Sequence, residues 1–483
     1  MTFKHGFPLM QSLRPLARAA LFSLLIATLS CAQAGLHSDL PDLGAPDLVS
    51  YTPEKEQALG RAFSTTLHTQ FDMIQDPTLL DYVRQIGARI TSQTQSQRDY
   101  RFYVIDRSDI NAFAGPNGII GLHSGLILAA RSEDELASVI AHEIAHVTQR
   151  HLSRRYEYQN NNTATTIASL IAAILVGSQN PSAGMATMMG ATGLNLQQQL
   201  KNSRLHENEA DHFGIRYLTE AGYNPFAMGD FFGRLARESQ YDEFALPEIL
   251  RTHPVSADRL ARADDRAGQM PKDTQKRAIQ KDTLTLMQLR LQNHHPEDIN
   301  AFEQAKLSSA QSCYRKNHQA WLKQQDTAVA YSLKCLDQAE QDAAASPYYA
   351  LLKAQIQTRL KRRDALKTLD YLTDVYPRNA AMVLARARAL QAFEGPQAAI
   401  AYLEQNVDRF LHKAEFYNRL SQLHTEQEDD FYSDYYQALL QEHLGNIEKA
   451  RYLSRQAKAH VTAEMRKKNA RIEQLKSRLT QYR

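Results

Sequence analysis

Hydrophobic positions recur at helical spacing early in the chain and then form short uninterrupted runs. Between residues 50 and 98 apolar residues lie three or four positions apart, which predicts two helices. The runs 101–105 and 118–122 predict two short strands, with 111–114 and a Gly-Pro-Asn-Gly turn between them. The run 118–122 is a candidate sheet edge on which an extended peptide could pair. A buried hairpin explains the same pattern equally well.

A helix is predicted after these strands. Ser132 stands at an N-cap position and Glu135 follows three residues later, which is the spacing of a capping box. The apolar stretches 166–176 and 183–194 then predict a helical hairpin within 163–194, whose arms are shorter than the roughly 20 residues needed to cross a bilayer. Two interpretations of the hairpin stay open: a buried helix pair, or a flap that touches a membrane surface or a partner.

Beyond Asp282 the chain repeats itself at a spacing of 34 residues, as in Ala365 with Ala399 and Leu369 with Leu403. A 34-residue helix-turn-helix period is the tetratricopeptide signature, so residues 282–483 are predicted to form an all-α tetratricopeptide-repeat domain. An unrelated helical bundle is the alternative.

The C-terminal segment is basic, with ten Lys or Arg between Arg451 and the end of the chain against two Glu. Ile472, Leu475 and Leu479 share one helical face there, which predicts a capping helix with a solvated basic surface.

The N-terminus has the order of a secretory signal. Three basic residues precede the apolar run 19–29, and Ala32-Gln33-Ala34 follows it, which predicts a signal peptide over 1–34 cleaved near Ala34. The run is short for a membrane anchor. A lipoprotein signal would place Leu where Thr28 stands, three residues before Cys31.

Export determines how the cysteines are interpreted. Cleavage near Ala34 leaves Cys313 and Cys335, which lie 22 residues apart in a helical region and in a compartment that permits disulfides. We expect them to pair, with two buried free thiols as the alternative.

Composition narrows the function classes. The 483 residues suffice for two to four domains, and 43% hydrophobic with 23% charged residues is typical of a folded chain rather than a multi-span membrane protein. The net charge of +3 arises from the first 34 residues, because basic and acidic residues are equal in number beyond them. The net charge therefore does not indicate a nucleic-acid partner.

The decisive chemistry is the His142-Glu143-Ile144-Ala145-His146 segment, which lies in the predicted helix. Residues four apart project from one helical face, so the two imidazoles can share one ion, and this arrangement suits Zn²⁺. Glu143 is placed to accept a proton from a water at the metal. The motif predicts a zinc hydrolase with one Zn²⁺ per chain.

A zinc site of this kind needs a third protein ligand. The metzincin pattern fails, because Leu152 stands where that pattern requires His. A second predicted helix 61 residues beyond His146 carries Glu207 and Asp211, four residues apart. This spacing lets Glu207 bind the metal while Asp211 orients a ligand imidazole from behind.

These two helices and the later Thr252-His253-Pro254 resemble the gluzincin family that contains the CAAX prenyl proteases and the bacterial heat-shock membrane protease. With its signal peptide and repeats, the chain is most similar to periplasmic members of that family. The resemblance implies a mainly α zincin-like protease domain with a small β-sheet (α+β) over 35–275.

The resemblance also implies roles for individual residues. His142, His146 and Glu207 would ligate zinc, Glu143 would be the catalytic base, and Asp211 would support catalysis. His253 would be a regulatory fourth ligand that keeps the enzyme latent.

Two functions follow from different parts of the sequence. The first is a periplasmic zinc endopeptidase, with chaperone activity, that acts on unfolded or stalled outer-membrane proteins while its repeats contact the assembly machinery. The second is a tetratricopeptide scaffold or chaperone whose metal site is latent. An intact Glu143 favours the first, because a scaffold does not need a base.

Overall fold

A computed structural model of the chain describes residues 51–158, 196–239, 246–271, 282–294, 307–341, 346–462 and 465–482. The predicted signal peptide (1–34) and the predicted apolar hairpin (163–194) lie outside these residues. The described part is mostly helical with one small sheet, in agreement with the predicted fold class. Among the described residues, no helix combines the length and the apolar character that a membrane crossing requires.

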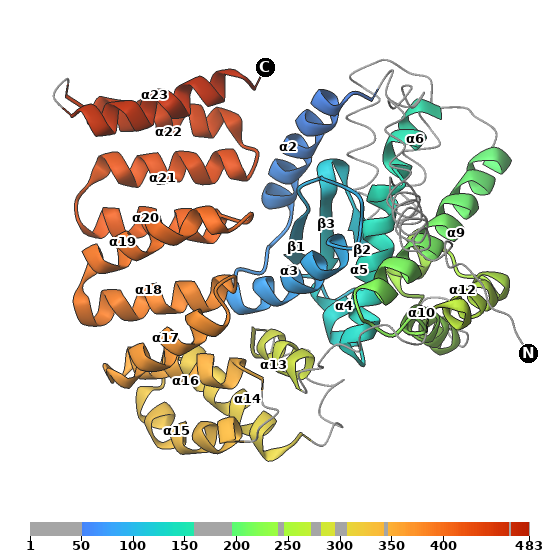
Figure 1. Cartoon of the computed structure of the whole chain (residues 1–483), viewed down its shortest axis with the longest axis horizontal. Helices are drawn as coiled ribbons and strands as arrows, with labels where there is room; N and C mark the ends of the chain where they lie inside the picture. Colours follow the sequence, from blue (N-terminus) through green and yellow to red (C-terminus); the bar gives the residue numbers. More distant parts are fainter. Residues whose placement is uncertain are drawn as a thin grey trace, which may run out of the picture. The chain divides into compact units, whose positions relative to one another are not determined.

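The N-terminal half places a three-stranded sheet among helices (Figure 1). Its elements in chain order are α2 (Pro53–Gln70), α3 (Pro77–Thr91), β1 (Arg101–Ile105), β2 (Ala112–Ala114), β3 (Ile119–His123), α4 (Ser124–Ala129), α5 (Glu133–Thr148), α6 (His151–Tyr158), α9 (Leu196–Glu220), α10 (Ala227–Glu238), α11 (Glu248–Thr252), α12 (Ala257–Gln269) and α13 (Thr283–His294).

The strand order decides between the two interpretations of residues 118–122 in favour of the buried hairpin. β3, the strand predicted over 118–122 as a sheet edge, is central: it pairs in parallel with β1 and antiparallel with β2, and all five of its residues are buried. The two outer strands of this sheet are β1 and β2, and β2 lies in the segment predicted only to separate two strands. Asn117 and Gly118 have φ of 58° and 72°, and this tight left-handed turn folds β2 back onto β3.

Helix α5 begins close to where the sequence places it. Ser132 is the N-cap and accepts a hydrogen bond from the Glu135 amide at 3.1 Å. The second half of the predicted capping box does not form, because the Glu135 carboxylate accepts from the Arg131 amide and from Arg234 instead. The N-cap prediction is confirmed, and the capping box is wrong.

Helices α5 and α9 lie side by side and carry the candidate site (Figure 1). A glycine at position 214 of α9 permits this approach. A Cβ there would lie 3.3 Å from both the carbonyl oxygen of Ala141 and the Cα of His142. A larger residue would push α9 away from the histidines of α5.

The C-terminal half is built from helices stacked in chain order (Figure 1). Ala365 and Ala399, which the 34-residue spacing makes equivalent, are both buried near the start of α17 and α19, and Leu369 and Leu403 are buried one turn later. The helices are α14 (Ser309–Leu322), α15 (Asp326–Gln341), α16 (Tyr348–Arg359), α17 (Asp364–Val375), α18 (Ala380–Glu394), α19 (Pro396–Asn406), α20 (Ala414–Glu426), α21 (Asp430–His443), α22 (Ile447–Ala459) and α23 (Arg466–Thr480).

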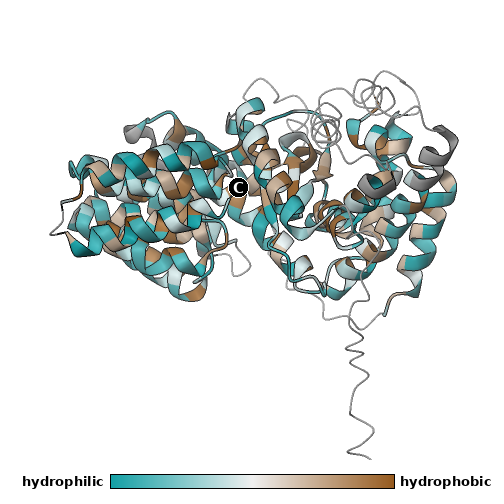
Figure 2. Cartoon of the chain, turned by 90° about the horizontal axis from the view of Figure 1, so that it is seen from above, coloured by the Kyte–Doolittle hydropathy of each residue, from teal (hydrophilic) through white to brown (hydrophobic). Residues whose placement is uncertain are grey.

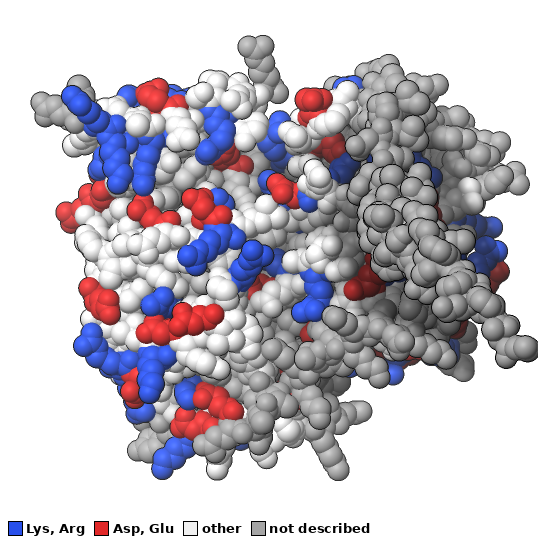
Figure 3. Space-filling model, viewed as in Figure 1, with Lys and Arg blue, Asp and Glu red and all other residues white. Residues whose placement is uncertain are grey.

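The last helix has the predicted amphipathic form. α23 buries Ile472, Leu475 and Leu479 against the outer helices. Several of its basic side chains pair with acidic ones, as in Arg478 with Glu442 at 2.6 Å. On the face shown in Figure 3, basic and acidic groups are accordingly interspersed along the stacked helices.

Cys313 of α14 and Cys335 of α15 are joined by a disulfide, with Cα atoms 6.1 Å apart. The bond connects two neighbouring helices and closes a short loop of chain. In the chain-entropy account, a cross-link over a loop of this length contributes about 3 kcal/mol to the free energy of unfolding.

One hydrophobic core runs through both halves. Its buried residues extend from Ile74, before α3, to Ala389 in α18. Helix α13, which the sequence places at the start of the repeat region, packs on both sides: Gln288 donates to the carbonyl oxygens of Ile127 and Ala130 at 2.9 and 2.8 Å. The hydropathy colouring in Figure 2 shows helices with hydrophilic residues outward and hydrophobic residues facing their neighbours.

Candidate metal centre

Two helices and one loop bring four ligand side chains together. His142 and His146 lie one turn apart on α5, Glu207 lies on α9, and His253 follows α11 directly. One ligand atom from each of the four lies within 4.8 Å of the others. His146 is half-buried and the other three are buried. Imidazole nitrogens and a carboxylate oxygen converging on one point form the donor set of a zinc site, so this cluster could hold a metal ion.

Glu143 lies beside this cluster, where α5 meets the edge strand. Its Oε1 is 3.4 Å from Nε2 of His253, and the backbone of Ala114 in β2 is near enough to the Glu143 carboxylate to lower its pKa. Burial raises the pKa of Glu143 above its ordinary value, and the nearby His253 and His142 oppose that rise. A carboxylate with a raised pKa is suited to accept a proton near neutral pH.

The protonation of the two α5 histidines differs because their neighbours differ. His142 places Nδ1 at 3.0 Å from Asp211 and Nε2 at 3.3 Å from Glu207. Burial alone lowers the pKa of His142, but these carboxylates outweigh it and raise the pKa to about 9. Burial dominates at His146, whose pKa falls well below its usual value. A metal ligand must be deprotonated, so a metal ion competes with a proton chiefly at His142.

An arginine links the carboxylates to the His253 loop. Arg259 of α12 donates from Nε and Nη2 to the two oxygens of Asp211, at 2.6 and 2.8 Å. Its Nη1 lies 3.1 Å from Oε2 of Glu207 and donates to the Pro254 carbonyl at 3.0 Å. This buried network fixes Asp211 behind His142 and ties Glu207 to the residue that follows His253.

A second supporting contact is made behind His146. Nδ1 of His151 lies 2.8 Å from Nδ1 of His146, and Nε2 of His151 lies 3.1 Å from the Glu209 carboxylate. The His151 ring stacks on that of His206, with centroids 4.3 Å apart. His151 thus holds the His146 ring from the side opposite the cluster.

The structure brings together every residue that the sequence placed at the metal site, and it adds Arg259 and His151. The sequence does carry a weak signal for Arg259, because it is the first basic residue after His253 and is the third residue of a helix capped by Ser256. His151 stands one residue before the position at which the metzincin pattern requires His, and its contact with His146 gives it a supporting role.

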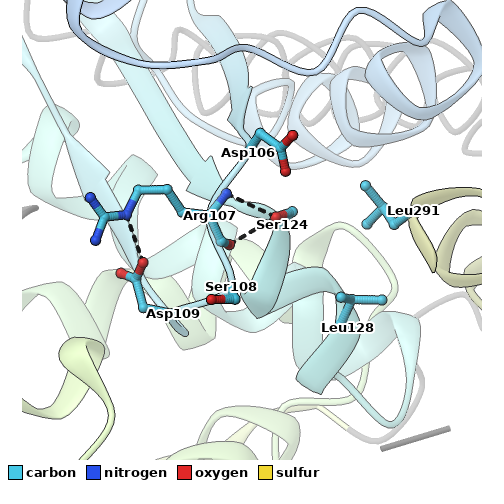
Figure 4. Close-up of a pocket in the computed structure, with 7 residues that line it drawn as sticks. All are labelled: Asp106, Arg107, Ser108, Asp109, Ser124, Leu128 and Leu291. Carbon is cyan, nitrogen blue, oxygen red and sulfur yellow. Dashed lines mark hydrogen bonds and ion pairs between the residues drawn. The ribbon is translucent and has the colours of Figure 1, made fainter. Parts of the chain in front are cut away.

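A separate pocket of about 360 Å³ lies beyond the end of β1 (Figure 4). Arg107 and Asp109 in its wall pair with each other at 2.7 Å, and Ser124 bonds the Arg107 backbone. None of its lining residues belongs to the metal cluster. The charges of Arg107 and Asp109 neutralise each other.

Comparison with known proteins agrees with this geometry. Residues 79–267 match the sequence model of peptidase family M48, a family of zinc metalloproteases. The chain is similar to a protein of Vibrio cholerae named "Putative beta-barrel assembly-enhancing protease", with 41% identity over 234 residues, or 48% of each chain. It is also similar to the "Beta-barrel assembly-enhancing protease" of Escherichia coli, with 36% identity over 256 residues, or 52% of each chain.

A shorter relative matches the same region. The "Metalloprotease LoiP" of Escherichia coli is 30% identical over 171 residues, which are 35% of this chain and 62% of that protein. The chain therefore spans about half the length of the first two relatives and somewhat more of the third.

Proposed function

We propose that this chain, whose residues 79–267 form a peptidase family M48 domain, is a zinc-dependent endopeptidase. The observation that carries the proposal is the convergence of His142, His146 and Glu207 on one point, with Glu143 buried beside them. Three protein ligands with one further position is the arrangement of catalytic rather than structural zinc sites.

Each residue then has a chemical task. Zinc, when bound, lowers the pKa of a water molecule to about 7 and polarises the scissile carbonyl. Glu143 removes the proton from that water and returns it to the leaving amine. Asp211 holds the His142 ring through Nδ1, and Arg259 holds Asp211.

The edge strand supports a role in binding extended peptides. Within the described residues β2 pairs with β3 alone, and its Ala114 backbone lies near Glu143. A peptide added as a further strand to this edge would pass the base. Backbone pairing reads little sequence, which suits a protease that acts on unfolded chains of many kinds.

Substrate and location extend the proposal. The names of the relatives point to β-barrel assembly, so we assign unfolded or stalled outer-membrane β-barrel proteins as substrates. Residues 1–34 would export the chain to the periplasm, 35–275 would form the protease domain, and 282–483 would form tetratricopeptide repeats that contact the assembly machinery. Peripheral membrane contact through 163–194 belongs to the same proposal.

Metal content and metal dependence test the enzymatic function. The purified full chain should contain about one zinc ion, and a zinc chelator should stop its cleavage of an unfolded β-barrel protein. Cleavage should return when zinc is added back. Cleavage that continues at full rate in zinc-free protein would reject the proposal.

His253 gives a second expected result. Its Nδ1 lies 3.0 Å from Glu207 and 3.2 Å from Nε2 of His142, and this supports the proposal that the ring blocks the entry of substrate and water. If this latch leaves about a tenth of the molecules open, His253→Ala should raise the initial cleavage rate by roughly tenfold without loss of zinc.

The matched control is His460→Ala, which removes a histidine from the far end of α22 and should leave the rate unchanged. A His253→Ala variant with full zinc and an unchanged or lower rate would show that His253 is not a latch. In that case the His253 side chain would act by stabilising the transition state.

A further inference from the structure

A groove of about 350 Å³ lies among the stacked helices, and none of its lining residues belongs to the metal cluster. It is formed where the C-terminal ends of α14 and α16 meet the middle of α18. One wall is apolar, with Trp321 and Leu322 at the end of α14 and the buried Ala385 on α18.

The apolar wall is held in position by its neighbours. Arg359 of α16 donates from Nη1 to the Trp321 carbonyl at 2.9 Å, which satisfies a C-terminal carbonyl of α14. The Trp321 ring stacks on His318, with centroids 5.9 Å apart. Trp321 is half-buried, so part of the indole remains accessible from the groove.

The other wall carries a cation that nothing in the described structure neutralises. Arg388 of α18 lines the groove and makes no hydrogen bond or ion pair within the described residues. Asp76 is the carboxylate that attracts it, and Arg290 already binds both oxygens of Asp76, at 2.7 and 3.0 Å.

A second cation adds to the positive charge near the groove. Arg419 of α20 is close enough to lower the pKa of Arg388, after the larger lowering by burial. Arg419 bonds the amide side chains of Gln391 and Gln422, and its carboxylate partner, Glu426, is 3.9 Å away. The groove therefore combines an apolar wall with unneutralised positive charge, and this combination attracts an anion that carries an apolar group.

We propose that this groove binds the C-terminal residue of an unfolded polypeptide. Trp321 and Arg388 line one small pocket, so a ligand residue must offer an apolar side chain and a carboxylate together. Among peptide residues, only an apolar residue at a C-terminus has both. Its side chain packs on Trp321 and Leu322, and its carboxylate accepts hydrogen bonds from the Arg388 guanidinium.

The sequence provides its own reporter for this binding. Trp321 is the one tryptophan of the chain, so intrinsic fluorescence observes the groove directly. The full-length Glu143→Gln variant is titrated with a six-residue peptide that ends in phenylalanine with a free carboxylate. We expect a saturable change in emission. The same peptide with a C-terminal amide should bind at least tenfold more weakly.

Substitutions on α18 then locate the carboxylate. Arg388→Gln should weaken the binding of the free-acid peptide by about tenfold and leave the binding of the amide peptide almost unaffected. Arg388→Lys should retain part of the affinity for the free-acid peptide. Arg386→Gln is the matched control, because Arg386 pairs with Asp370 at 2.7 Å and does not line the groove. Circular dichroism establishes that each variant is folded.

Several outcomes would overturn the proposal. These are no binding of the free-acid peptide, equal affinity for acid and amide, or full affinity in Arg388→Gln. Equally tight binding of an amidated peptide with an internal glutamate would show that the groove reads acidic side chains rather than chain ends. Because the readout is binding, each result stands whether or not the metal centre hydrolyses peptides.

Discussion

Glu143→Gln should lower the rate of peptide cleavage by about 10²–10⁴-fold and leave the zinc content unchanged. The amide keeps the shape of the side chain but cannot take a proton from water. Cleavage of an unfolded β-barrel protein, followed by gel analysis, measures the loss, and metal analysis of the same sample establishes that the site is loaded. Equal rates in the variant and the wild type would contradict the assignment of Glu143 as the base.

Glu220→Gln is the matched control, since Glu220 lies at the exposed end of α9 and pairs with Arg216. The same pair of variants separates the two functions considered for the chain. If Glu143→Gln supports outer-membrane assembly in cells as well as the wild type does, the helical repeats carry the function as a scaffold and the metal site is dispensable.

His142→Ala and His146→Ala should each lose bound zinc, and with it all metal-dependent cleavage, because each removes one of three protein ligands. Asp211→Asn should retain zinc but weaken its affinity by about 10–100-fold, because the amide still contacts Nδ1 of His142 without its charge. Competition with a chelator of known affinity measures all three variants.

His212→Ala supplies the control for this series. His212 lies one residue beyond Asp211 on α9, contacts Arg266 and is absent from the ligand cluster. The His212→Ala variant should bind zinc as the wild type does. Full zinc content in both the His142 and His146 variants would reject the ligand assignment.

The metal site was predictable because its geometry is local. A spacing of four on a helix is enough to place His142 and His146 on one face, and the same spacing relates Glu207 to Asp211. The one long-range inference, that α9 packs on α5, came from the need for a third ligand. The glycine at 214 that permits this packing carried no such signal in the sequence.

The supporting contacts were not predictable because they join elements with no fixed spacing. Arg259 reaches Asp211 from a different helix, 48 residues away. β2 has three residues, too few to show a periodic pattern, and its place at the sheet edge depends on the left-handed turn at Asn117. The helical character of the C-terminal half was easier to predict, because a 34-residue spacing relates several apolar positions at once.

The continuous core has a thermodynamic consequence. Since buried side chains from Ile74 to Ala389 form one cluster, neither half can unfold without exposing apolar surface that the other half covers. The two halves therefore share part of one unfolding free energy. A ligand that binds only the folded helices of the C-terminal half therefore raises the free energy needed to open the helices that hold His142 and Glu207. The stability of the metal centre is linked in this way to the occupancy of a surface that does not touch it.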